Sequence, residues 1–282
     1  MNKNTLDSGN QQSTFHPFFL IAKQELLGSF ASKGGLFVSG VFILIWSWLL
    51  FYPIQFAAEA IGNSEGSSFV LVILRWLGLE ALNSWALSEF AVYWAVALYL
   101  FPVFSLLMSS DQMISERKRG GLRFLTLRCS RGSIFFGRFI GHILIQACLL
   151  IVTLGITYLL LLANNSALWL EGMLVLPLLF LNLILVISPF VALMSLLSVA
   201  MNSVRIAILI AIIILVLARV MINSIASEFY VLSLFNYLVP GIQIKEMAQL
   251  SIDSTVSLLW IPVLQSICFL GLGYGLFKRQ SI

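Results

Sequence analysis

The sequence predicts an all-α polytopic membrane protein with six transmembrane helices. Its 282 residues are 60% hydrophobic and only 10% charged, whereas soluble domains carry about 25% charged residues. The apolar residues gather into six segments, each near the ~20 residues that a hydrocarbon core of about 30 Å requires. Most Lys and Arg residues fall between these segments on one side. Together these observations predict a single transmembrane domain over 15–282, preceded by a polar, disordered N-terminal tail over 1–14.

The first predicted element is an amphipathic elbow helix over 15–33. Polar residues such as Lys23 and Gln24 separate apolar residues that recur every three or four positions, which is the pattern of a helix with one apolar face. Pro17 suits the first turn of this helix, and two glycines follow the end of the helix. The helix is therefore expected to lie along the membrane surface before the chain turns into the first span. The recurring apolar residues are Phe15, Phe19, Ala22, Leu26 and Phe30.

Six apolar segments follow, and their lengths predict membrane-spanning helices. The fourth is longer than a straight crossing needs, so a tilt or a kink near Pro189 is expected. Between the first two spans, 69–87 contains tryptophans and charges that suit a helix at the outer interface. Between the last two, two short outer-leaflet helices are expected over 223–256, broken at Pro240 and Gly241. The predicted spans cover about 36–58, 90–109, 139–162, 174–201, 206–222 and 257–277.

The segment 110–141, between the second and third spans, concentrates positive charge. It holds seven of the 16 Lys and Arg residues, and this excess predicts a cytoplasmic position, with both chain termini on that side. Gly120 and Gly121 interrupt any helix and permit a sharp turn, after which a short helix is expected. Ser130 can cap a new helix that begins at about Arg131. The segment could serve only to bind anionic lipid headgroups, or it could be a docking element for a soluble partner.

Several kinds of function are not supported by the composition. A net charge of +4 is small and localised, which argues against nucleic-acid binding. The three cysteines have no paired spacing and are expected to be reduced. The histidines, His16 and His142, have no metal-ligand spacing with Cys, Asp or Glu, and no Gly-rich nucleotide loop is present. We therefore expect neither a catalytic set nor a metal site.

Polar residues within the spans have simpler explanations than catalysis. His142 lies one helical turn after Arg138 and is expected to be an interfacial side chain. Arg219, near the outer end of the fifth span, is expected to extend to the outer interface, although it could mark a substrate path. Interhelical hydrogen bonds are expected from Gln146, Asn182 and Gln265.

A more specific pattern runs through the basic segment. An acidic residue, a basic cluster and a glycine precede a short apolar helix, and a Ser-Arg pair and a Gly-Arg-Phe-x-Gly run follow it. These residues are Glu116, Arg117, Lys118, Arg119, Gly120, Leu122, Leu125, Ser130, Arg131, Gly137, Arg138, Phe139 and Gly141. The pattern resembles the first cytoplasmic loop of the ABC-2-type transporter permeases, in which the short helix is a coupling helix. Gly121, Arg123 and Cys129 depart from the residues usual there. The elbow stretch 22–26 and the aromatic-basic C-terminus, 273–279, resemble the family more weakly.

The resemblance implies a transmembrane subunit of an ABC transporter, coupled to ATP-binding-cassette ATPase subunits that bind ATP and Mg themselves. Six spans are half of the twelve usual in such transporters, so a second permease copy, identical or paralogous, is implied. Leu122 and Leu125 would insert into a groove of the ATPase, beside polar contacts from Glu116. The implied coupling residues are Glu116, Arg117, Lys118, Arg119, Gly120, Gly121, Leu122, Leu125, Arg128, Ser130 and Arg131, and Lys23 and Glu25 match the family's elbow helix.

Three functions remain open from the sequence. The first is an ATP-driven exporter subunit in the bacterial cytoplasmic (inner) membrane, moving a lipid-like, amphipathic or peptide substrate. The second is a subunit that passes ATPase-driven motion to an envelope or periplasmic partner through 69–87 and 224–253 without moving a solute. The third is a membrane enzyme acting on lipid, which would retain turnover without an ATPase and which the missing catalytic set disfavours.

Overall fold

The computed structural model describes residues 15–31, 33–51, 87–225, 237, 239–249 and 252–280. All regular secondary structure in these ranges is helical. The helices are α1 (Phe15–Ala31), α2 (Lys33–Leu49), α5 (Ser88–Met108), α6 (Ile114–Lys118), α7 (Gly121–Arg128), α8 (Arg131–Asn164), η3 (Ser166–Leu168), α9 (Trp169–Ala200), α10 (Val204–Ile225), α11 (Ile244–Gln249), α12 (Ile252–Thr255), η5 (Val256–Leu258) and α13 (Trp260–Arg279).

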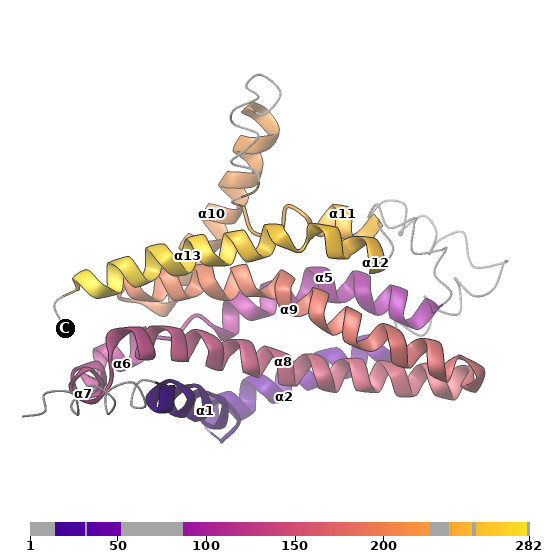
Figure 1. Ribbon diagram of the computed structural model, residues 1–282, viewed down its shortest axis with the longest axis horizontal. Coiled ribbons are helices and arrows are strands. Elements are labelled where there is room, and N and C mark those ends of the chain that lie inside the picture. Colours follow the sequence, from indigo (N-terminus) through magenta and orange to yellow (C-terminus); the bar gives the residue numbers. More distant parts are fainter. Residues whose placement is uncertain are drawn as a thin grey trace, which may run out of the picture.

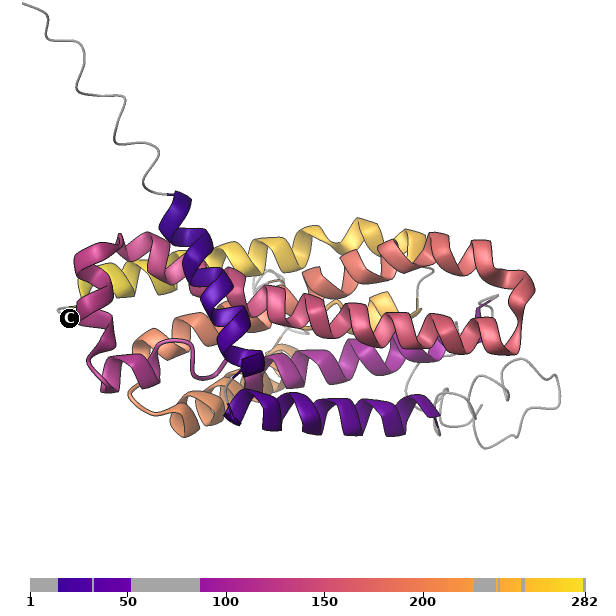
Figure 2. The ribbon, with the colours of Figure 1, turned by 90° about the horizontal axis from the view of Figure 1, so that it is seen from below.

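The long helices α5, α8, α9 and α13 run along the long axis of the molecule (Figure 1). α9 lies at the centre, since it packs against α5, α8, α10 and α13. α1 crosses the bundle steeply and packs on α8 (Figure 2). Figure 1 shows α1, α6, α7 and the end of α13 gathered at one end of the bundle, which we call the charged end.

Four helical segments of the described chain are long and apolar enough to cross a membrane: Glu89–Met108, Arg131–Asn164, Ser166–Ala200 and Val256–Arg279. They coincide with the second, third, fourth and sixth spans expected from the sequence. The predicted first span falls partly on α2, in which the apolar stretch Ser39–Leu49 is shorter than a crossing requires, and partly on residues outside the described ranges. The predicted fifth span falls on α10, whose apolar stretch Val204–Ala218, of 15 residues, is shorter than the candidate spans. A count of six spans therefore remains a prediction.

The core of the bundle is built around α5. Phe90, Tyr93, Trp94 and Phe101 are fully buried because successive turns of α5 face α8 and α9. α9 continues through both Pro177 and Pro189 as one helix of 32 residues. At about 1.5 Å per residue, this helix is longer than a ~30 Å hydrocarbon core.

α10 has a different environment from the other long helices. Figure 1 shows it standing away from the bundle, and it contacts α9 and α5. Among its described side chains only Ala207 and Ala211 are buried, whereas large aliphatic residues on the rest of its surface are exposed. The exposed ones include Ile206, Leu209, Ile213 and Leu217.

The region between α10 and α13 agrees in part with the sequence prediction. Gly241 has a φ of 86°, a left-handed conformation that suits glycine, and the short helices α11 and α12 follow this turn. Both pack against the bundle: Trp94 Nε1 donates a hydrogen bond to the Met247 carbonyl at 3.3 Å, and Asn182 Nδ2 donates to Thr255 Oγ1 at 2.6 Å. Residues 226–236 and the predicted outer-interface helix, apart from its last residue, lie outside the described ranges.

Candidate functional site at the charged end

The basic segment folds into two short helices with a sharp turn between them. α6 ends at Lys118, Gly120 adopts a φ of 74°, and α7 begins at Gly121. A left-handed residue with a side chain costs about 1–2 kcal/mol, so glycine suits this turn. Asp111 stabilises the first turn of α6, because its Oδ1 accepts from the Ser115 amide at 2.9 Å and its Oδ2 from the Ser115 hydroxyl at 2.5 Å. The break predicted at the two glycines is therefore confirmed.

The start of α8 is also as the sequence predicts. Ser130 is the N-cap residue, with extended backbone, and its hydroxyl accepts a hydrogen bond from the Ser133 amide at 3.1 Å. This bond satisfies one of the free amides at the start of a helix. α8 then continues to Asn164, so its first turns form part of the charged end and the remainder runs through the bundle.

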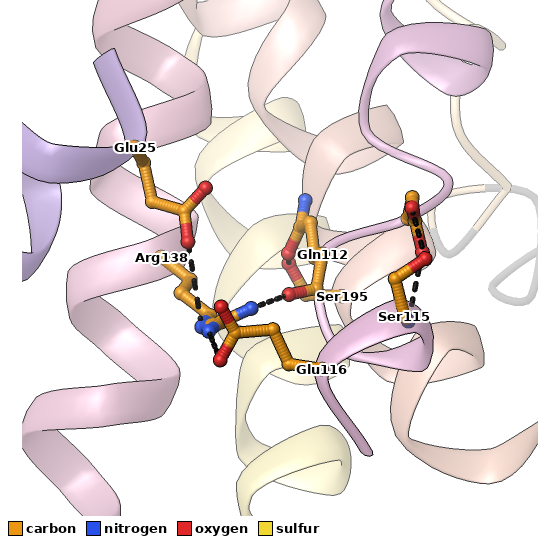
Figure 3. A network of polar contacts seen from close by, with 7 residues as sticks. Glu25, Gln112, Ser115, Glu116, Arg138 and Ser195 are labelled. Carbon is orange, nitrogen blue, oxygen red and sulfur yellow. Dashed lines mark hydrogen bonds and ion pairs between the residues drawn. The ribbon is translucent and has the colours of Figure 1, made fainter. Parts of the chain in front are cut away.

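Arg138, which is buried in α8, joins several elements through one guanidinium group (Figure 3). Its Nη2 lies 2.6 Å from Glu116 Oε2 of α6, and its Nε lies 3.5 Å from Glu25 Oε1 of α1. Its Nη1 donates to the Gln112 carbonyl, and the Gln112 side chain accepts from Ser195 Oγ of α9 at 2.6 Å. The segment that contains Gln112 and α6 is thus linked to α1, α8 and α9 at a single point.

Close packing of α1 on α8 brings Glu25 next to Arg138. A Cβ at Gly141 would lie 2.7 Å from the Glu25 Cβ and 3.2 Å from the Ala22 carbonyl oxygen, so only glycine allows this approach. The approach leaves the Glu25 side chain 25% exposed. Burial raises the pKa of Glu25 above its usual value; Arg138 opposes this rise, whereas Glu116 and Asp111 add to it.

Two further arginines bind the carbonyl ends of bundle helices. Arg117 Nη1 donates to the Val199 carbonyl at 2.7 Å, and its Nη2 donates to the Met201 carbonyl, both at the end of α9. Arg131 Nη1 donates to the Lys278 carbonyl at 2.7 Å and the Gln280 carbonyl at 2.9 Å, at the end of α13. These carbonyls have no partner within their own helices, and a positive charge beside them is favourable. The sequence pattern indicated both arginines as site residues but gave no sign of these partners.

The structure corrects the expected orientation of α7. Leu122 is only 2% exposed, and Leu125 is packed against the same cluster, which includes Phe135 and Phe277. Phe124 and Leu127, which sequence analysis did not select, are 73% and 83% exposed. Both pairs are three residues apart, so helical spacing alone did not show which pair faces the bundle. Insertion of Leu122 into a partner is therefore not supported.

The other predicted site residues lie on the surface or at the turn. Lys118, Arg119 and Arg128 are exposed, and Lys23 is exposed on α1. Gly121 lies beside Glu116, since a Cβ there would be 3.4 Å from Glu116 Oε2. In the part of the chain that the structure describes, no three His, Cys, Asp or Glu side chains are arranged to hold a metal ion.

The predicted interhelical hydrogen bond is confirmed for Asn182 of α9, which bonds Thr255 of α12. Gln265 Nε2 instead donates to the carbonyls of Tyr237 and Val239, each at 2.9 Å, in the segment before α11. The prediction for Gln146 is wrong, because both of its polar side-chain atoms are buried and have no hydrogen-bond partner among the described residues.

His142, expected at the interface, is only 7% exposed and is buried in the bundle. The side chains of His16 and Arg219 lie outside what the structure describes.

Comparison with known proteins agrees with this architecture. The sequence profile of the family described as "ABC-2 family transporter protein" matches residues 19–282. A similar protein is the "Probable ABC transporter permease protein NosY" of Stutzerimonas stutzeri, 30% identical over 113 residues. That match spans 38% of this chain and 37% of the relative's length. Since the family match covers nearly the whole chain and the bundle contains several membrane-spanning candidates, this multi-pass membrane protein belongs to the ABC-2 family of transporter proteins.

Proposed function

We propose that this chain is the transmembrane permease subunit of an ATP-driven exporter. A separate ATP-binding-cassette ATPase would bind ATP and Mg and supply the motion, and the substrate would be lipid-like, amphipathic or a peptide. Family membership and the permease name of the similar protein support the class of transporter. The alternative is force transmission to an envelope partner; the permease name of the similar protein favours movement of a solute, so export is the function proposed.

The observation that carries the ATPase contact is the exposed apolar pair of α7. Phe124 and Leu127 are mostly exposed at the charged end, with Arg123 and Arg128 exposed beside them. Large apolar side chains ringed by charge are typical of protein interfaces, in which a few buried anchors provide most of the affinity. Phe124 and Leu127 would thus enter the groove that the sequence resemblance assigned to Leu122 and Leu125.

Motion of α7 would reach the bundle by three connections. Arg138 ties the segment to α1, and Arg117 and Arg131 tie it to the ends of α9 and α13. These contacts support a coupled movement of α1, α9 and α13 along with the directly connected α5 and α8. The spans on either side of the loop would therefore move together with three neighbouring helices.

The proposed topology has six spans, with α2 and α10 as the first and fifth, and both termini in the cytoplasm of a bacterial cell. The basic residues at the charged end support this orientation. A second permease copy would complete the transporter, and the exposed aliphatic surface of α10 is available for contact with that copy.

The ATPase contact can be tested by purifying the chain together with its ATPase. The double substitution Phe124→Ala and Leu127→Ala should reduce the co-purified ATPase at least tenfold, because each anchor contributes upwards of about 1 kcal/mol. A matched control is Leu170→Ala with Met173→Ala, since both residues are more than half exposed in the first turns of α9, at the opposite end of the bundle. Equal ATPase recovery from the two double variants would refute this contact.

A further inference from the structure

A cavity of about 880 Å³ lies beside the charged site, between α1, α2, α5 and α6. One part of its lining is apolar and comes from α2 and α5. The other part carries several charged groups. The apolar lining includes Phe37, Val41, Phe42, Ile45, Trp46 and Phe104, and the polar lining includes Glu25, Asp111, Glu116, Arg119, Arg138 and His142.

The apolar part has the dimensions of one membrane leaflet. Phe42 and Trp46 are buried, with stacked rings 5.8 Å apart, whereas Phe37 and Ile45 are exposed, so the cavity reaches the outer surface of α2. From Phe37 to Trp46 the wall extends about 14 Å along the helix, at about 1.5 Å per residue. A leaflet is about half of a ~30 Å hydrocarbon core, so this wall matches the depth of one acyl chain.

The polar part offers charges of both signs. The charge of Arg138 is balanced by Glu116 and Glu25, and Asp111 accepts hydrogen bonds from Ser115. Arg119 is exposed and forms no ion pair with the described residues. A ligand with a positive and a negative group could therefore satisfy both Arg119 and the excess of carboxylates.

His142 gives independent support for a ligand. It is more than nine-tenths buried and lines the cavity, and its Nδ1 has no hydrogen-bond partner among the residues that the structure describes. A buried polar atom without a partner costs about 1–3 kcal/mol, which a hydrogen bond donated by the imidazole to the phosphate of a bound headgroup would offset.

We propose that this cavity binds one membrane phospholipid with a zwitterionic headgroup. The acyl chain lies along Phe42 and Trp46, the phosphate lies near Arg119 and His142, and the ammonium group lies near Asp111 and Glu116. A fatty-acid anion would meet three carboxylates without supplying a cation, so it fits less well. Because binding requires no nucleotide, this site does not depend on the transport function proposed above.

Binding can be measured on the purified full chain in mild detergent with a lysophosphatidylcholine that carries bromine atoms on its acyl chain. Bromine in the cavity quenches the fluorescence of Trp46, so saturable quenching is expected in the native chain and should be reduced in Trp46→Phe, in which the other six tryptophans remain. A brominated fatty acid of the same length should bind at least tenfold more weakly. Undiminished quenching in Trp46→Phe, or equal affinity for the fatty acid, would overturn the proposal.

Two glycines provide a matched pair of variants. Gly28 lines the cavity and Gly155 lies on α8 away from it, and a Cβ at either position would have no atom within 4 Å. Gly28→Leu should fill part of the cavity and weaken lysophosphatidylcholine binding at least tenfold, whereas Gly155→Leu should leave it unchanged. Equal binding by the two variants, both eluting as a single species in size-exclusion chromatography, would refute the site.

The role of His142 in headgroup binding has its own readout. His142→Phe should weaken the binding of brominated lysophosphatidylcholine about two- to tenfold, the value of one hydrogen bond. It should leave unchanged the binding of a brominated fatty alcohol, which lacks the phosphate. An equal loss for both probes would show that His142 only supports packing and would remove it from the headgroup site.

Discussion

Replacement of Arg138 by methionine should destabilise the whole charged end. The substitution retains a long apolar stem but removes the ion pairs to Glu116 and Glu25 and the bond to the Gln112 carbonyl. Loss of one member of a fully buried pair costs about 3–5 kcal/mol. Here the carboxylate side chains are 42% and 25% exposed, so water reaches both and the expected loss falls to about 2–3 kcal/mol.

Thermal unfolding followed by tryptophan fluorescence measures this effect. At about 2–4 °C per kcal/mol, the Tm of Arg138→Met should fall by roughly 5–10 °C. Adding Glu116→Gln removes the charge left unpaired and should restore part of the loss. Arg123→Met is the control, because Arg123 is exposed and its removal should change stability by less than about 0.5 kcal/mol. If Arg138→Met and Arg123→Met had the same Tm, the central role of Arg138 would be refuted.

Three further outcomes follow from the site. Because burial raises the pKa of Glu25, ionising this side chain costs stability. The Tm should therefore fall as the pH rises from the ordinary carboxyl range through the raised pKa. Glu25→Gln should flatten this part of the Tm-against-pH curve, and parallel curves for the two proteins would contradict the prediction. Gly141→Ala should lower stability by about 1–3 kcal/mol, because the added methyl group meets α1. Gly155→Ala has no neighbour within 4 Å of the added methyl group and should raise stability by about 0.5–1 kcal/mol. Chemical denaturation of the two variants measures these effects, which should have opposite signs. Arg131→Met removes the donor that bonds the last carbonyls of α13, so the C-terminus should open more often. Tryptic cleavage at the C-terminus, measured by intact mass, should become about threefold to tenfold faster. An unchanged rate of cleavage would contradict this prediction.

Local features were the most predictable from the sequence. The turn at Gly120 and the cap at Ser130 depend on backbone conformation and on residues within one helical turn, so both appear in the sequence pattern. The long apolar segments likewise predicted the positions of α5, α8, α9 and α13.

Features that depend on distant contacts were not predictable in the same way. Glu25 and Arg138 are far apart in the sequence, and only the packing of α1 on α8 brings them together. On α7, both apolar pairs fit one face of a helix, and the choice between them is made by the aromatic cluster around Phe135. Gln146 was expected to bond a neighbouring helix, but no donor or acceptor of the packed bundle lies within reach.

Because α9 is one continuous helix, a small rotation of its end at the charged end would move its opposite end much further. Its 32 residues extend about 48 Å at about 1.5 Å per residue, and Arg117 grips its last carbonyls. If this rod pivots by about 5° at the gripped end, its opposite tip swings through about 4 Å, which is close to the diameter of a methylene chain. A few degrees of tilt imposed at the charged end would thus be enough to open or shut a gap the width of a lipid tail at the opposite end of the bundle.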